Sequence, residues 1–295
     1  MLALVAILMV LFFILSSTDL LVREEKQEIK KVSVISSGES GSVWEDFRRG
    51  IQEAANEDRV EANYIVLGEE GETWTQTELI EREYQRGAQA IILVVKDRGT
   101  MEDYLAGKQD MVPLIIVNSF GNYDHQVSRI LFDTDAAAKR LVQEIVKQES
   151  SLQPVTCLTG ESQISAEVYK SLKKAFAAEG IETESTTMSH GVEKAEGILI
   201  GCGPQETEEL LAKTGEGQRR TIYGVGHSDT ILKEMEAGNV KGIMAYSMYS
   251  MGVHAVREAV SAIDEGEAEA TVLVPCKLIT GDNLKEEQTF LFPIH

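Results

Sequence analysis

Cysteine and histidine side chains are candidates for nucleophilic, acid–base and metal chemistry, and the chain has three cysteines and five histidines. Cys157, Cys202 and Cys276 show no CxxC or other metal spacing, and each lies in or beside an apolar run, which favours buried free thiols. The histidines show no paired metal-ligand spacing. The GxSxG, P-loop and HExxH motifs do not occur. Two Gly-x-Gly sequences are present, but each has fewer glycines than a dinucleotide-binding fingerprint requires. We therefore expect a protein that is not an enzyme and that holds no cofactor or metal.

A small polar loop at residues 36–41, Ser-Ser-Gly-Glu-Ser-Gly, has the composition of a ligand-binding loop. The residues before it predict a buried strand, because they include Val32, Val34 and Ile35. Ser42 and Glu45 form a capping-box pattern, which predicts that a helix starts directly after the loop. In an open parallel sheet, ligands bind outside the carboxyl ends of strands, where such loops lie. Trp44, in the first turn of the helix, would lie over this loop.

The same strand–loop–helix order is repeated along the chain. Strands are predicted at 62–67, 90–95 and 112–117, and a second capping box, Thr75 with Glu78, starts a helix between the first two. After a brief strand at 130–132 the series restarts at Val155 and runs to a strand at 240–245. Two such series in 295 residues predict an α/β fold with two doubly wound parallel-sheet lobes. The cleft between the lobes is the default ligand site.

Composition excludes one class of partner. The chain is 43% hydrophobic and 26% charged, which is ordinary for a globular protein. Its net charge of −20 would repel a phosphate backbone, so we expect no nucleic-acid partner.

The first eighteen residues carry no charged side chain, and about 18–20 apolar residues can span a bilayer. No A-x-A-like cleavage site follows, and no cysteine is available there for lipid attachment. We predict an uncleaved N-terminal transmembrane helix at residues 1–22 as a membrane anchor and a polar tether at 23–30. The basic residues all follow the span, which by the positive-inside rule favours a cytoplasmic body; they are Arg23, Lys26, Lys30 and Lys31.

Several ordered motifs resemble those of one known family. They include the stretch 44–51 (WEDFRRGI), the stretch 86–93 (RGAQAIIL), the stretch 132–137 (FDTDAA), the stretch 223–226 (YGVG) and the pair Met251-Gly252. With these motifs the chain resembles the periplasmic ribose-binding-protein type, a fold shared with the ligand-sensing core of lactose-repressor-like regulators. The resemblance runs from about Lys31 to Leu284.

The resemblance implies three crossings between the lobes, near 132–135, 245–248 and 275–278. The N-terminal lobe would then comprise 31–133 plus 247–274, and the C-terminal lobe 134–246 plus 275–295. A membrane segment stands where the regulators have a DNA-binding headpiece, which favours an extracytoplasmic receptor on the cell membrane over a repressor.

The resemblance also implies ligand-binding residues. Trp44 falls where the family stacks an aromatic ring on a sugar, Lys96 and Asp97 where it places a polar or acidic pair, and Asn118 where a polar ligand contact is common. We add Glu161, His227 and Tyr246 as further cleft residues. The alternatives are a core position for Trp44 and solvated loop positions for the charged residues and for His227.

Three positions depart from the family's sugar anchors, which leaves the ligand's identity open. An arginine is expected in the helix after Thr159-Gly160, but this helix has Ala166-Glu167. Gly226-His227 replaces an acidic residue and Tyr246 an amide or acid. Since sugar hydroxyls are usually held by charged or amide groups, a free pentose or hexose is in doubt. His227 could replace one lost anchor.

The expected function is that of a membrane-anchored solute-binding protein. It would close two lobes on a small polar ligand, a sugar or sugar derivative, for import by a membrane transporter permease. Alternatives are a module that signals to a membrane histidine kinase or chemoreceptor, or a degenerate binding fold with an interaction role. Neighbouring permease and ATPase genes would favour import, a neighbouring kinase gene would favour sensing, and a blocked cleft would favour the degenerate fold.

Overall fold

The computed structural model describes residues 29–37, 42–68, 74–108, 111–121, 123, 127–150, 152, 154–187, 192, 195–213, 220–266 and 270–293, without the side chains of Ser42 and Val43. The predicted membrane anchor at 1–22, most of the tether, part of the loop at 36–41 and the Ser42 cap lie outside the described residues. Within these ranges no helix combines the length and the apolar character that a membrane span requires.

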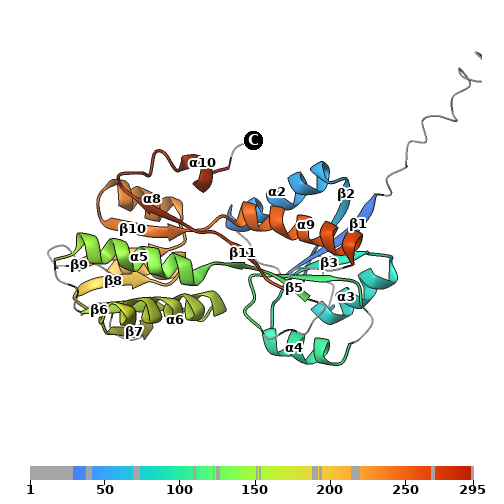
Figure 1. The fold of residues 1–295 in the computed structure, drawn as a ribbon, viewed down its shortest axis with the longest axis horizontal. Coiled ribbons are helices and arrows are strands. Elements are labelled where there is room, and N and C mark those ends of the chain that lie inside the picture. The colour runs from blue at the N-terminus through green and yellow to red at the C-terminus, as the bar shows by residue number, and fades with distance from the viewer. Residues whose placement is uncertain are drawn as a thin grey trace, which may run out of the picture. The chain divides into compact units, whose positions relative to one another are not determined.

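The first sheet has six strands in the order β11-β5-β4-β3-β1-β2 (Figure 1). Its strands are β1 (Lys30–Ser36), β2 (Val60–Val66), β3 (Ala90–Val94), β4 (Leu114–Val117), β5 (Val127–Phe132) and β11 (Val272–Val274). From β1 through β3, β4 and β5 to β11, all neighbouring strands pair in parallel.

Helices cover both faces of this sheet because its strands are apolar on both sides. In β3, Ile92 and Val94 belong to the cluster with α2 (Ser42–Glu57) and α9 (Met248–Glu265). Ile91 and Leu93 instead join the cluster with α3 (Gln76–Gln85) and α4 (Arg98–Ala106). Successive residues of a strand point to opposite faces, so a continuous apolar run indicates burial on both sides. We call this sheet with its four helices the first lobe.

The second sheet also has six strands, in the order β12-β10-β9-β8-β6-β7. They are β6 (Val155–Thr159), β7 (Thr183–Thr187), β8 (Gly197–Gly201), β9 (Arg220–Val225), β10 (Val240–Ala245) and β12 (Lys277–Thr280). Helices α5 (Thr134–Gln148) and α6 (Gln163–Ala178) pack on one face, and α7 (Pro204–Lys213) and α8 (Asp229–Glu236) pack on the other. We call this sheet with these helices the second lobe. The prediction of two α/β lobes built on parallel sheets is therefore confirmed.

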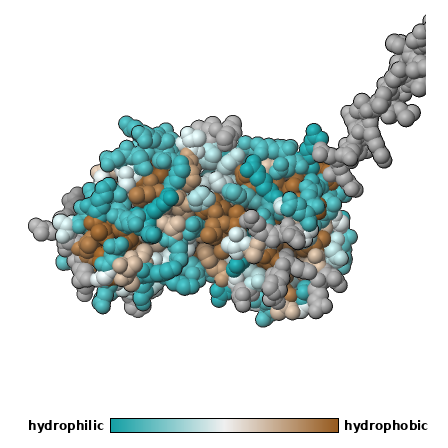
Figure 2. Space-filling model, viewed as in Figure 1, coloured by the Kyte–Doolittle hydropathy of each residue, from teal (hydrophilic) through white to brown (hydrophobic). Residues whose placement is uncertain are grey.

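The chain passes between the two sheets after β5, after β10 and after β11 (Figure 1). One buried hydrophobic cluster contains residues of both sheets, for example Ile92 of β3 and Ile200 of β8. The bounds of the two lobes along the chain remain those that we propose from the sequence. From the side shown in Figure 2, hydrophilic residues cover most of the described surface, and hydrophobic residues form smaller patches between them.

Three features of the fold differ from the prediction. Strand β7, with the sequence TESTT, has no buried residue, and the sequence analysis missed it because an exposed edge strand lacks an apolar pattern. Strand β12 runs antiparallel to β10, so the second sheet is not wholly parallel. The short helix α10 (Gln288–Leu291) was also missed.

Candidate ligand cleft

A hollow of about 600 Å³ opens at the carboxyl ends of strands from both sheets. The first lobe contributes Trp44 and the residues after β3 and β4, and the second lobe contributes the loops after β6 and β8. Tyr246 and Met248 line it where the chain passes from β10 to α9. This is the place where open parallel sheets bind ligands, and its volume suits a small molecule. We call it the cleft.

The end of β3 is fixed by the buried side chain of Gln76. Its Nε2 donates to the carbonyl oxygen of Val94 at 2.7 Å, and its Oε1 accepts from the backbone N–H of Lys96 at 2.8 Å. Both atoms of the amide are therefore used to hold the strand end. The side chain of Lys96 is left exposed at the cleft.

Asn118, directly after β4, has a strained backbone and an unpaired side-chain oxygen. Its φ of 56° lies in the left-handed region, which non-glycine residues seldom adopt, and its N–H donates to the carbonyl oxygen of Ile130 at 2.8 Å. Among the described residues, nothing donates a hydrogen bond to its buried Oδ1. Strain and unpaired polar atoms persist mainly where function requires them, so Asn118 is a candidate ligand contact.

The opposite wall is built on glycines and helix caps of the second lobe. Ser162 caps α6 by accepting from the backbone N–H of Ser165 at 3.2 Å, and Ser165 Oγ accepts from the N–H of Gly160 at 2.9 Å. Glu206 lies in the first turn of α7, and its side chain is folded against Gly160 and Gly203. A Cβ on Gly160 would lie 2.0 Å from Glu206 Oε1, so any larger residue at 160 would displace this carboxylate from its present position.

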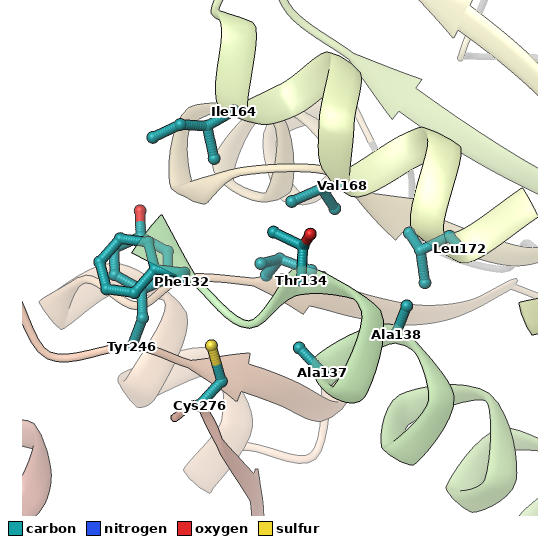
Figure 3. A pocket seen from close by; sticks show the side chains of 10 residues that line it. Phe132, Thr134, Ala137, Ala138, Ile164, Val168, Leu172, Tyr246 and Cys276 are labelled. Carbon is teal, nitrogen blue, oxygen red and sulfur yellow. The ribbon is translucent and has the colours of Figure 1, made fainter. Parts of the chain in front are cut away.

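Tyr246 stacks on Phe132 at the point where the lobes join. Their ring centroids are 4.3 Å apart with an interplanar angle of 31°. Beside this pair lies an apolar pit of about 10 Å³, room for at most about one water molecule (Figure 3). Its walls include Thr134, Ile164 and Cys276. Tyr246 and Ile164 line both the pit and the cleft, so a tightly packed apolar layer supports this end of the cleft.

Five of the seven predicted ligand-binding residues line the cleft together: Trp44, Lys96, Asn118, Glu161 and Tyr246. Trp44 is half-buried, lines the cleft and also packs edge-to-face on Phe47, with ring centroids 5.7 Å apart. That these five residues contact a ligand remains a prediction.

Asp97 and His227 are not among the residues that line the cleft. The exposed Asp97 is the N-cap of α4 and accepts from the backbone N–H of Thr100 at 2.7 Å. Hydrogen bonds from Thr100 lower the pKa of this carboxyl below its usual value. Asp97 is therefore accounted for by helix capping.

His227 packs against the C-terminal segment instead of facing the cleft. It hydrogen-bonds to the backbone of Leu291, and its ring meets that of Phe292 edge-on at 6.4 Å. Burial lowers the pKa of His227, although this hydrogen bond and the nearby Asp46 and Asp229 raise it. Its buried Nδ1 has no hydrogen-bond partner within the described part of the chain. Residues far away in sequence therefore cover the ring, and ligand binding by His227 remains a prediction.

The three cysteines are buried free thiols, as predicted. Cys202 lies at the floor of the cleft, and its hydrogen bond with Cys157, together with burial, raises the pKa of its thiol. Burial also raises the pKa of Cys276, to about 12. Raised thiol pKa values indicate inert side chains, which agrees with a packing role.

Several residues of the cleft wall were not predicted from the sequence, namely Ser119, Ser162, Gln163, Gln205 and Glu206. A signal was present for some of them. Gly201-Cys202-Gly203 ends a predicted strand, and Pro204 suits the first turn of a helix, so the polar residues that follow it lie at a strand–helix junction like those that were selected.

Comparison with known proteins places the chain in a family. The model of the periplasmic binding protein domain matches residues 32–268, so the chain belongs to the periplasmic binding protein family. This is a family of solute-binding proteins and not of enzymes. No curated protein matches the sequence.

Solved structures share the fold at low sequence identity. A periplasmic ribose ABC transporter protein from Conexibacter woesei has a TM-score of 0.74 and 15% identity, over 88% of this chain and 95% of that one. An ABC transporter solute-binding protein from Burkholderia graminis, solved with D-arabinose, has a TM-score of 0.70 and 19% identity, over 88% and 98%. The myo-inositol binding protein of Caulobacter has a TM-score of 0.70 and 18% identity, over 88% and 96%. The chain thus has the fold of periplasmic sugar-binding proteins.

Proposed function

We propose that this protein is an extracytoplasmic solute-binding protein that closes its two lobes on a small polar ligand, a sugar or sugar derivative, for import by an ABC transporter. The observation that carries the proposal is the cleft, whose walls come from both sheets and which contains the buried, unpaired Oδ1 of Asn118. A ligand that contacts both walls makes more contacts when the lobes approach, and so it stabilises the closed state. The transporter would recognise the closed state.

The open, polar cleft argues against a degenerate fold. A fold that had lost its ligand would be free to fill this space with apolar side chains, which stabilise a core. Instead, about 600 Å³ remains, and Asn118 keeps both its backbone strain and its unpaired oxygen. A sensory role, in which the closed state signals to a membrane histidine kinase or chemoreceptor, would use the same cleft. Neighbouring permease and ATPase genes would support import over sensing.

The test is a ligand screen by thermal unfolding of the full chain in mild detergent. The probes are D-ribose, D-arabinose and myo-inositol, which the names of the similar structures suggest, and other small polar metabolites. A ligand that binds only the native state at 100 times its Kd stabilises it by about 2.7 kcal/mol, which raises the unfolding midpoint. If no small polar molecule raises the midpoint, the proposal fails.

We further propose that residues 1–22 anchor the protein in the membrane. Support comes from the uncharged run of eighteen residues, whose length suits a bilayer span. An anchored protein should stay with the membrane fraction after a carbonate wash, and deletion of residues 1–22 should release it. Release of the intact chain by carbonate would contradict the anchor.

A further inference from the structure

The cleft has an acidic balance of charge. Three charged side chains line it among the described residues: Lys96, Glu161 and Glu206. Lys96 and Glu161 are exposed, so water screens their charges, whereas Glu206 is only 5% exposed. The charge that a bound ligand would feel most strongly is therefore that of the Glu206 carboxylate, because charges interact more strongly where water is excluded.

The Glu206 carboxylate sits in a narrow slot in the wall of the cleft. A Cβ on Gly160 would lie 2.0 Å from its Oε1, and one on Gly203 would lie 2.4 Å from its Oε2, so two glycines make the slot in which it sits. Within the described part of the chain, no hydrogen bond or ion pair reaches this carboxylate. Glu206 is only 5% exposed and lines the cleft, so a positively charged group of a ligand could reach its carboxylate where little water competes.

We propose that the ligand of the cleft carries a protonated amine, whose ammonium group pairs with Glu206. This inference rests on the proposed function and narrows its ligand to amine-bearing small molecules, such as amino sugars. A neutral polyol could donate hydrogen bonds to the carboxylate but would leave its charge uncompensated, whereas an ammonium group supplies both donors and charge.

Two further features favour a cation. Trp44 and Tyr246 line the same cleft, and an aromatic ring whose face is accessible attracts an ammonium group. The net charge of −20 also raises the local concentration of cations around the protein.

The experiment measures affinities by isothermal titration calorimetry with the full chain in mild detergent. The probes are D-glucosamine, N-acetyl-D-glucosamine and D-glucose, with the corresponding galactose compounds as a second set. Acetylation keeps the nitrogen and removes its charge. We expect the amine to bind at least about tenfold more tightly than either neutral compound, because hydrogen bonds to charged groups are worth more than neutral ones.

Glu206→Gln should abolish this preference, since glutamine keeps the shape and removes the charge. Glu236→Gln, at an exposed position on α8 that does not line the cleft, removes the same charge elsewhere and should leave the preference intact. The unfolding midpoint of each variant without ligand reports whether it is folded. The comparison of probes on the unmodified chain does not depend on any variant.

Two results would overturn the inference. If a neutral compound binds as tightly as its amine, or if Glu206→Gln keeps the preference for the amine, the carboxylate does not select a cation, but the proposed function stands. If none of the six compounds binds, the inference fails, whereas the proposed function is decided by the wider thermal-unfolding screen.

Discussion

Replacing Gly252 by alanine should loosen the contact between α2 and α9, on which the position of Trp44 depends. Gly252 in α9 and Gly50 in α2 are both buried where these helices cross. A Cβ on Gly252 would lie 2.4 Å from the carbonyl oxygen of Phe47 and 2.9 Å from the backbone nitrogen of Ile51. These are backbone atoms of a helix, so they cannot move aside as the end of a side chain can.

The cost follows from this geometry. To lengthen the 2.4 Å contact to an ordinary 3.4 Å, the two helices must separate by about 1 Å. Overpacking of this kind costs about 3 kcal/mol at the upper end of its usual range. Replacing glycine by alanine in the interior of a helix stabilises the helix by about 1 kcal/mol. We therefore expect Gly252→Ala to lower the free energy of unfolding by about 2 kcal/mol.

Urea unfolding followed by tryptophan fluorescence measures this change. The matched control is Gly99→Ala in α4, where the new Cβ would meet only Asp97 Oδ1 at 3.8 Å on an exposed surface. The control should be as stable as the unmodified protein or slightly more stable, because only the helix propensity changes. If Gly252→Ala proves as stable as the control, then α2 and α9 are not in backbone contact and the reasoning fails.

Three other changes test the site and its surroundings. Trp44→Ala should weaken ligand binding by about 1–3 kcal/mol in calorimetry, because an aromatic surface is lost; unchanged affinity would make Trp44 a core residue only. Asn118→Gly keeps the left-handed backbone and removes the amide, so affinity should fall by about 1–3 kcal/mol while the urea midpoint changes little; a large loss of stability instead would assign Asn118 a structural role. His227 has a lowered pKa in the folded state, so the unfolded state binds its proton more readily, and stability should decline as the pH falls below about 6.5. This decline should be smaller in His227→Gln when unfolding midpoints are compared from pH 8 to pH 5, and equal declines would show that His227 is not protected by the fold.

The alternation of strands and helices was predictable because it depends on local patterns. Val34 and Ile35 belong to a buried strand. Phe47 and Ile51 lie on a helix and face the protein core, as their spacing indicates. The capping box of Thr75 and Glu78 forms as predicted, with reciprocal hydrogen bonds. Each of these features depends on residues within one turn or one strand, so the sequence alone specifies them.

Two features of the site could not be predicted from the sequence: contacts with distant parts of the chain, and the choice between helix capping and ligand binding. His227 is covered by Leu291 and Phe292, which lie more than sixty residues later in the sequence, and no local pattern announces this contact. Asp97 follows a strand and also precedes a helix; position in the family suggested a ligand contact, but the structure shows a helix cap. Capping and ligand binding use the same residue types at the same junctions, so the sequence could not distinguish them.

The polar groups around the cleft divide into those that build its walls and those that the fold leaves unpaired. Gln76 uses both atoms of its amide to hold the end of β3, and Ser165 fixes the loop at Gly160. Asn118 Oδ1 and the Glu206 carboxylate have no such partners among the described residues, and they belong to different lobes. A ligand that donates hydrogen bonds to both groups would give each of them a partner. It can do so only when the walls are close enough for one molecule to reach both. The free energy of binding would then depend on closure itself, which is what a transporter or sensor needs in order to distinguish the loaded protein from the empty one.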